Sequence, residues 1–385
     1  MTYFIPHASI HTDTKSLDEK SCPTCAAANP PRLPPWIHRQ WQIICLLAFT
    51  GCGTATAVDR LPALHAGSEQ TSVSGISSGG YMAVQFHIAY SSIVKGAGVV
   101  AGGPFYCAQN DAKTAAKNCM QPDTSHPLPA AEELVAFTGA IEKAGAIDTT
   151  QNLKNSKIWL FSGRQDKLVK QAVMNELQRY YLNYAPATNI VYENTTDAGH
   201  AFPTVNFGGE CSYNGPPFID KCGIDGAGAL LRHIYGYLNP PAVAAGGTLK
   251  EFDQREFFDG DAYSHSMRDS GFVYIPQACA QASCRVHVAF HGCMQNVDTV
   301  GNNFIQHTGY NEWADTNKLI IIYPQTISRY GIGWKFWKLN FVLNPQGCWD
   351  WWGYDSANYY KKDDYKKDGS QMRAVKKMID RLASN

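Results

Sequence analysis

The fold is decided by residues 71–80, Thr71-Ser72-Val73-Ser74-Gly75-Ile76-Ser77-Ser78-Gly79-Gly80. A strand is predicted before the Gly-x-Ser-x-Gly motif and a helix after it, which is the context that a nucleophile elbow requires. Gly75 and Gly79 permit the sharp turn that lifts Ser77 out of the sheet, and the helix N-terminus favours negative charge developing beside it. We therefore predict that Ser77 is a nucleophile. The alternative is a tight turn of glycine and serine without chemistry.

Outward from this segment, short apolar runs alternate with stretches of helical periodicity, which is the pattern of an α/β sheet flanked by helices. Several of the apolar runs are continuous, as expected of strands that are buried on both faces of a mostly parallel sheet. Strands are predicted at 71–74, 98–101, 157–162, 189–193, 272–276, 285–290 and 319–323. Helices are predicted at 79–91, 131–144, 171–184, 227–238 and 370–382.

A serine hydroxyl is a weak nucleophile, so Ser77 needs a general base, and the base needs an orienting carboxylate. In α/β hydrolases the acid and then the histidine follow the serine along the chain. Asp166 lies just past a predicted strand, and His200 lies in a glycine-containing loop after the next one. We predict that Asp166 and His200 are the acid and the base. Asp148, near a helix end, and Asp197, in the histidine loop, are weaker alternatives for the acid.

Another predicted strand, at 285–290, runs into His291-Gly292-Cys293. His291 is the main rival to His200 as the base. A His-Gly turn of this kind, however, is typical of the loop that supplies one backbone N–H group to an oxyanion hole, while the residue after the nucleophile supplies the other. We therefore predict that the amides of Ser78 and Cys293 form the oxyanion hole.

The order of these parts is unusual, because the oxyanion strand of an ordinary α/β hydrolase precedes the nucleophile and here it follows. Residues 239–247 form a linker by their proline, alanine and glycine content. Residues 248–258 and 271–276 then resemble the antiparallel start of a sheet. We predict a circularly permuted α/β-hydrolase fold, in which 58–385 is a single catalytic domain and the linker joins the original ends. Permutation is tolerated where termini lie close together at the surface.

Composition narrows the class of protein. Lys+Arg 33 balance Asp+Glu 33 over 385 residues, so the chain lacks the basic excess that nucleic-acid binding requires. Residues 1–57 are expected to be an N-terminal extension and signal peptide, because the apolar run Trp41–Thr50 is too short to span a bilayer and small residues follow it to Ala57. Phe49-Thr50-Gly51-Cys52 resembles a lipobox, so a lipid anchor at Cys52 on the outer cell surface is the alternative to free secretion.

Cysteine usage also points to export. Eight of the 12 cysteines follow residue 57, and an even number in an exported chain predicts disulfides. The sequence alone does not fix their pairing, and buried free thiols are the alternative. Closeness along the chain favours the pairs Cys107–Cys119, Cys211–Cys222 and Cys279–Cys284, which leaves Cys293 for Cys348.

Several motifs carry a family resemblance. They are residues 72–83 around Ser77, Ala101-Gly102-Gly103-Pro104-Phe105-Tyr106-Cys107, Gly199-His200-Ala201-Phe202, His291-Gly292-Cys293 and Cys348-Trp349-Asp350-Trp351. Together they resemble the extracellular poly(3-hydroxybutyrate) depolymerases of the single-domain, circularly permuted type, and the resemblance covers nearly the whole expected mature chain.

The resemblance implies a serine esterase that cleaves a short-chain polyhydroxyalkanoate through an acyl-enzyme and needs no metal or cofactor. It implies a triad of Ser77, Asp166 and His200, and the oxyanion hole predicted above. It also implies a substrate contact by Trp349, and we expect Trp351 and His291 to contact substrate as well. The lipid anchor at Cys52 would be a departure from a secreted family.

Five of the nine tryptophans lie between Trp334 and Trp352, and exposed aromatic rings could adsorb to an insoluble polyester. We expect roughly half of them to be buried, as tryptophan commonly is, and we expect a monomer. One alternative is an esterase acting on feruloyl or acetyl esters of plant polysaccharide, since a triad does not encode the acid that is recognised. Another, of a different class, is a non-catalytic surface lipoprotein that binds polymer.

Overall fold

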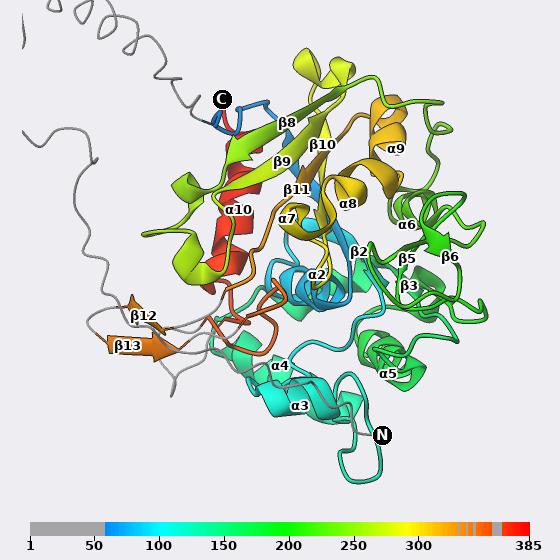
Figure 1. Ribbon diagram of the computed structural model, residues 1–385, viewed down its shortest axis with the longest axis vertical. Helices are drawn as coiled ribbons and strands as arrows, with labels where there is room; N and C mark the ends of the chain where they lie inside the picture. Colours follow the sequence, from blue (N-terminus) through cyan, green and yellow to red (C-terminus); the bar gives the residue numbers. More distant parts are fainter. Residues whose placement is uncertain (1–57, 330–331, 336–337, 342–343, 356–363) are drawn as a thin grey trace, which may run out of the picture. The chain divides into compact units, whose positions relative to one another are not determined.

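An eight-stranded sheet with the order β4-β3-β2-β1-β10-β11-β9-β8 forms the centre of the computed structural model (Figure 1). The structure describes residues 58–329, 332–335, 338–341, 344–355 and 364–385. The strands of the sheet are β1 (Gly67–Ile76), β2 (Val94–Val100), β3 (Lys157–Phe161), β4 (Ile190–Glu193), β8 (Thr248–Asp253), β9 (Ser270–Ile275), β10 (Arg285–Phe290) and β11 (Leu319–Tyr323). Neighbours from β4 to β11 pair in parallel, and β9 and β8 add two antiparallel strands. The predicted mostly parallel α/β sheet is confirmed.

The strand order reveals a circular permutation. Counted from β8, the strands lie in the order 1-2-4-3-5-6-7-8, so that β10 becomes the third strand and β1, which carries Ser77, the fifth. This puts the oxyanion loop after the third strand, where α/β hydrolases have it. The start and the end of the described part also meet, because the N–H of Ala66 donates to the carbonyl of Leu382 at 2.9 Å. Adjacent termini are the condition under which a permuted chain closes the same fold.

Helices cover both faces of the sheet (Figure 1). One face packs mainly against α2 (Ser78–Ala89), α4 (Ala131–Lys143), α5 (Gln171–Leu182) and α10 (Ser370–Ala383). The other face packs against α6 (Gly226–Tyr235), α8 (Asn303–His307) and α9 (Tyr310–Asn317). Two short helices, α3 (Ala112–Lys117) and α7 (Val297–Val300), lie in loops. Burial on two sides explains why β11 is a continuous apolar run and why β10 is apolar apart from Arg285 and His287.

The two helices that support β1 differ in pattern. Every residue of α2 is buried, so this helix passes through the protein interior directly behind Ser77. The C-terminal helix α10 instead buries one stripe, in which Met372, Val375 and Ile379 are each 0 % exposed. Fully burying such a side chain stabilises a fold by roughly 1.5–3 kcal/mol. The apolar residues are spaced three and four apart, and the helix predicted at 370–382 is confirmed.

Smaller elements follow the histidine loop and the last parallel strand. A three-stranded sheet is formed by β5 (Phe202–Thr204), β6 (Gly209–Glu210) and β7 (Ile219–Lys221), and a hairpin by β12 (Ile332–Lys335) and β13 (Lys338–Phe341). None of these is predicted from the sequence, since strands of two to four residues carry little periodicity.

All four predicted disulfides are present: Cys107–Cys119, Cys211–Cys222, Cys279–Cys284 and Cys293–Cys348. Ala57–Asn385 forms one compact unit. In the part of the chain that the structure describes, no helix has both the length and the apolar character needed to cross a bilayer. The predicted signal peptide and the lipobox at Cys52 lie outside the described residues.

Candidate active site

Ser77 occupies the turn between β1 and α2, with φ 56° and ψ −125°. A residue with a side chain rarely adopts positive φ, so this backbone is strained and must be held by its surroundings. The Ser77 N–H donates to the carbonyl of Val100 on β2 at 2.9 Å, and the Ser77 carbonyl accepts from the N–H of Tyr81 in α2 at 3.0 Å. The strained residue is thus tied to a central strand and to the buried helix.

The glycines of the elbow are required by close backbone contacts. A Cβ atom on Gly79 would lie 2.3 Å from the carbonyl oxygens of both Phe290 and His291, and one on Gly75 would lie 2.2 Å from the carbonyl oxygen of Gly79. No side chain fits at such distances. The elbow therefore packs directly on the end of β10, which places Ser77 beside the 291–293 turn.

His200 and Asp166 are joined by a hydrogen bond in which Nδ1 of His200 lies 2.8 Å from Oδ2 of Asp166. Both side chains are buried, with 4 % and 0 % of their surface exposed. The other carboxylate oxygen, Oδ1, accepts the N–H groups of Leu168 and Val169, each at 2.8 Å. The Asp166 carboxylate is therefore fixed by the loop that follows β3, and it presents one oxygen to the imidazole.

The two alternative acids have other partners. Asp197 forms an exposed ion pair with Arg164, and the hydrogen bond from this guanidinium lowers the pKa of the Asp197 carboxyl. Asp148 accepts hydrogen bonds from Ser92 and forms an ion pair with the ammonium group of Lys367. Neither contact involves His200, so the geometry favours Asp166 among the three candidates.

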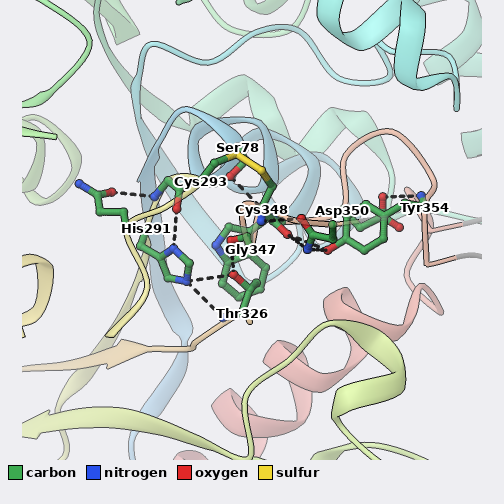
Figure 2. Close-up of a disulfide and its surroundings, with 12 residues drawn as sticks. Ser78, His291, Cys293, Thr326, Gly347, Cys348, Asp350 and Tyr354 are labelled. Atoms are coloured by element: carbon green, nitrogen blue, oxygen red, sulfur yellow. Dashed lines mark hydrogen bonds between the residues drawn. A yellow bond between two sulfur atoms is a disulfide. The ribbon is translucent and has the colours of Figure 1, made fainter. Parts of the chain in front are cut away.

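The 291–293 turn is held from below by His291, which is 0 % exposed (Figure 2). Its Nδ1–H donates to the carbonyl of Gly292 at 2.7 Å, and its Nε2 accepts the N–H of Thr326 at 3.2 Å. Burial lowers the pKa of His291 to about 4, so the ring is neutral. Because a trans peptide directs its C=O and N–H oppositely, anchoring the Gly292 carbonyl turns the Cys293 N–H away from His291. The expectation of a substrate contact by His291 is corrected: its side chain has no exposed surface and holds the turn.

The Cys293–Cys348 disulfide ties this turn to the segment 344–355 (Figure 2). In that segment the Trp349 N–H donates to Oγ of Ser78 at 3.3 Å. Ser78 and Cys293, the two residues whose amides were predicted to form the oxyanion hole, are thus both linked to consecutive residues of one loop.

Two cavities open at Ser77. The smaller, of about 100 Å³, is lined by Ser77, His200, Phe218 and Cys293 among others. The larger, of about 200 Å³, is lined by Ser77, Ser78, Cys293 and the rings of Tyr81, Trp351 and Trp352. Ser77 and Cys293 belong to both, so Ser77 lies where the cavities meet.

The tryptophans near the site take different places. Trp349 is 0 % exposed and packs against Phe290 and His291, with ring centroids 5.0 and 5.6 Å away. It therefore offers no surface to a polymer, which corrects the expectation that this ring contacts substrate. Its indole Nε1–H is nevertheless buried and has no hydrogen-bond partner among the residues that the structure describes. Trp351 is stacked on Tyr81 at 3.8 Å and faces the larger cavity.

Sequence reasoning missed several residues of this site. Met120 lines both cavities, and Phe218 and Gln295 line the smaller one. Nothing in their local sequence marks them, because each reaches the site through a loop whose path is set by distant contacts. The side chains of Trp334 and Trp337 lie outside what the structure describes.

Comparisons with known proteins place the chain in a family. It is 44% identical over 344 residues to a poly(3-hydroxybutyrate) depolymerase of Delftia acidovorans, spanning 88% of this chain but only 64% of that protein. It is 38% identical to a polyhydroxybutyrate depolymerase of Talaromyces funiculosus, spanning 85% of this chain and 94% of that protein. No family model matches.

Solved structures agree with these relatives. The crystal structure of a PHB depolymerase from Penicillium funiculosum superposes with a TM-score of 0.74 at 37% identity, covering 84% of this chain and 98% of that one. A second structure, of a PHB depolymerase with a serine-to-alanine substitution complexed with an R3HB trimer, gives the same values. With a match over nearly the full length of the Talaromyces enzyme, this chain belongs to the poly(3-hydroxybutyrate) depolymerase family.

Proposed function

We propose that the chain is a serine esterase that hydrolyses the ester bonds of poly(3-hydroxybutyrate) or a similar short-chain polyhydroxyalkanoate. The observation that carries this proposal is the joint position of Ser77 and His200 in one small cavity, with His200 bonded to the buried Asp166. Family membership supports the substrate class, because the relatives are named for this polymer.

The proposed reaction runs in two halves. Oγ of Ser77 attacks the ester carbonyl carbon while Nε2 of His200 takes its proton, and the amides of Ser78 and Cys293 stabilise the resulting oxyanion. Collapse of the tetrahedral species expels the alcohol end, which receives the proton from His200. A water molecule then loses a proton to His200 and attacks the acyl-enzyme, releasing a 3-hydroxyacid end and restoring Ser77.

Asp166 orients the imidazole throughout. Its Oδ2 accepts from Nδ1–H of His200, which leaves Nε2 unprotonated and free to take the serine proton. Since Oδ1 is already occupied by two backbone N–H groups, the carboxylate cannot rotate away without losing them. The residues described require no metal or cofactor for these steps.

Several features favour a small aliphatic ester within a polymer. The cavities are narrow, about 100 and 200 Å³, and apolar side chains such as Met120 and Leu168 line them. Leu168 belongs to the smaller cavity and is 36% exposed, and Tyr213, near the His200 loop, is 49% exposed. Exposed apolar side chains at the rim of a site are suited to contact with a polyester surface. Four disulfides support an extracellular location.

The test compares wild-type protein, Ser77→Ala and a control, Ser125→Ala, which alters an exposed serine away from the cavities. We expect wild type and control to clear polyester granules and to be labelled by an organophosphonate, and Ser77→Ala to do neither while keeping its unfolding temperature. A panel of granules, feruloyl esters and acetyl esters identifies the acid recognised. Preference for the feruloyl or acetyl esters would overturn the proposed polyester substrate. Absence of organophosphonate labelling in the wild type would overturn the proposed serine mechanism.

A further inference from the structure

Gln295 is a buried amide in the wall of the smaller cavity, 1 % exposed, and it uses both ends of its side chain. Oε1 accepts the N–H of Gly292 at 2.7 Å. Nε2 donates to the carbonyls of Pro217 and Phe218, at 2.9 and 3.1 Å. One side chain therefore bridges two loops that lie far apart in the sequence and that meet beside Ser77.

On the first loop, Gln295 completes the fixation of Gly292. The N–H of Gly292 is held by Gln295 and its carbonyl by Nδ1–H of His291, so the peptide units on both sides of this residue are immobilised. The second of these units contains the Cys293 N–H. A Cβ atom on Gly292 would lie 3.3 Å from Cβ of Ser77, which shows how closely the turn approaches the nucleophile. A small rotation here would move the Cys293 N–H relative to the reacting carbonyl.

On the second loop, Gln295 holds Phe218, whose ring stands against the imidazole of His200. The ring centroids are 6.0 Å apart with the planes at 83°, an edge-to-face contact. The Phe218 carbonyl also accepts the N–H of Phe202 at 2.8 Å, which belongs to the strand that follows His200. The backbone of the histidine loop and the amide of Gln295 thus meet on a single carbonyl oxygen.

We propose that Gln295 is a positioning residue that sets the oxyanion donor of Cys293 and the ring of His200 relative to each other. The inference rests on the proposed esterase function. The residue acts through the groups it holds, so its effect belongs to the transition state, where the oxyanion forms, more than to the binding of substrate.

The chain offers a closely matched control in Gln254. This glutamine is 0 % exposed, its Oε1 accepts the N–H of Gln325, and its Nε2 donates to the carbonyls of Arg268 and Gln325. It makes the same kinds of hydrogen bond as Gln295 but lines neither cavity at Ser77. Replacing either glutamine by methionine removes the same polar groups from the interior.

The experiment measures kcat and KM on a soluble short-chain ester for wild type, Gln295→Met and Gln254→Met. We expect Gln295→Met to lower kcat about 10- to 100-fold, as expected when an oxyanion donor is misplaced, with KM changed less than about threefold. Gln254→Met should keep kcat within about twofold, although both variants lose thermal stability. Equal kcat in the two variants, or a rise in KM alone for Gln295→Met, would overturn the proposal.

Gln295→Glu provides a second test if the methionine variant does not fold. The glutamate keeps an acceptor for the Gly292 N–H, but it can donate to the 217–218 carbonyls only when protonated. The ratio of its kcat to that of wild type should therefore rise as pH falls, whereas a flat ratio near one would count against the proposal. Amide hydrogen exchange of residues 289–294 should also be faster in Gln295→Met than in Gln254→Met. This readout needs no activity, so it separates failure of the positioning role from failure of the esterase function.

Discussion

The imidazole of His200 meets the Asp166 carboxylate on the one oxygen that the protein backbone leaves free. The other oxygen accepts two N–H groups, from Leu168 and Val169, at 2.8 Å each. This carboxylate is thus saturated before any substrate binds, and the tautomer of His200 follows from its orientation. The proton lies on Nδ1, and Nε2 is free to accept.

Asp166→Asn should preserve the fold and abolish most of the activity. The amide oxygen can still accept from Leu168 and Val169, which turns the NH₂ group toward His200 and forces the ring proton onto Nε2. In that tautomer the imidazole cannot accept the Ser77 proton, and the same substitution in another serine hydrolase costs about 10⁴-fold in kcat. Steady-state hydrolysis of a soluble ester measures the loss. Asp197→Asn, in the same region but paired with Arg164, should stay within a few-fold of wild type, and comparable losses in the two variants would contradict the assignment.

Gly79→Ala should destabilise the protein and inactivate it, because the new methyl group would meet the Phe290 and His291 carbonyl oxygens at 2.3 Å. Overpacking of this kind costs about 1–3 kcal/mol, and relief by movement of the elbow would displace Ser77. Gly139→Ala is the matched control: this glycine lies within α4 and a Cβ there meets nothing within 4 Å. It should stabilise the protein by about 0.5–1 kcal/mol. Urea unfolding of both variants tests the pair, and an unaltered stability of Gly79→Ala would show that the elbow is looser than described.

The parts of this fold that the sequence predicts are those with a strong local pattern. The strand at 319–323 is predicted to the residue because it is an uninterrupted apolar run. The strand at 285–290 is also predicted to the residue, because its other residues are apolar although Arg285 and His287 stand among them. The elbow follows from its glycines. Even the permutation is visible in the sequence. The 291–293 turn follows Ser77, although the corresponding turn of an ordinary α/β hydrolase precedes the nucleophile, and the linker at 239–247 lies between the two.

What the sequence cannot predict depends on contacts between distant segments. Gln295 gains its role only because residues 217–218 pass beside it, and nothing near either segment indicates that meeting. The burial of Trp349 is likewise set by Phe290 and by the disulfide at Cys348, whereas the family resemblance implied a ring in contact with substrate. Strand-end motifs locate the reacting groups, but the groups that hold them are found only in three dimensions.

Loss of the Cys293–Cys348 disulfide should cost more stability and more activity than loss of Cys279–Cys284. The first closes a separation of 55 residues and the second one of 5. By loop-closure entropy these correspond to about 4 and about 2 kcal/mol. Only the first holds the oxyanion turn, so the double serine variant at 293 and 348 should also lose at least about tenfold in kcat, while the variant at 279 and 284 should keep kcat within a few-fold. Chemical unfolding and kinetics on a soluble ester measure both effects, and an undiminished kcat at 293 and 348 would show that the turn needs no covalent tie.

Asp220 should make the protein less stable as pH rises from about 4 to about 7. The residue lies on β7 with 0 % exposure, and neither carboxyl oxygen makes a well-formed hydrogen bond within the described part of the chain. Burial is the main cause that raises its pKa from 3.8 to about 7, and the nearby Glu210 adds to the effect. Because the folded state holds the proton more tightly than the unfolded chain, the neutral form contributes fully below about pH 4. That contribution is lost progressively up to about pH 7, to a total on the order of 4 kcal/mol.

Asp220→Asn removes this titration, since the amide stays neutral. We expect the variant to match wild type or fall slightly below it near pH 4, and to exceed it by a few kcal/mol near pH 9, in urea unfolding at both values. Asp197→Asn removes instead an exposed carboxyl whose pKa is lowered by its hydrogen bond with Arg164, so it should gain nothing at alkaline pH. The β5–β7 sheet that contains Asp220 follows directly on His200, so this loss of stability should appear first as lost activity. Parallel pH profiles of stability in wild type and Asp220→Asn would show that this carboxyl ionises without cost and that the sheet around it admits water.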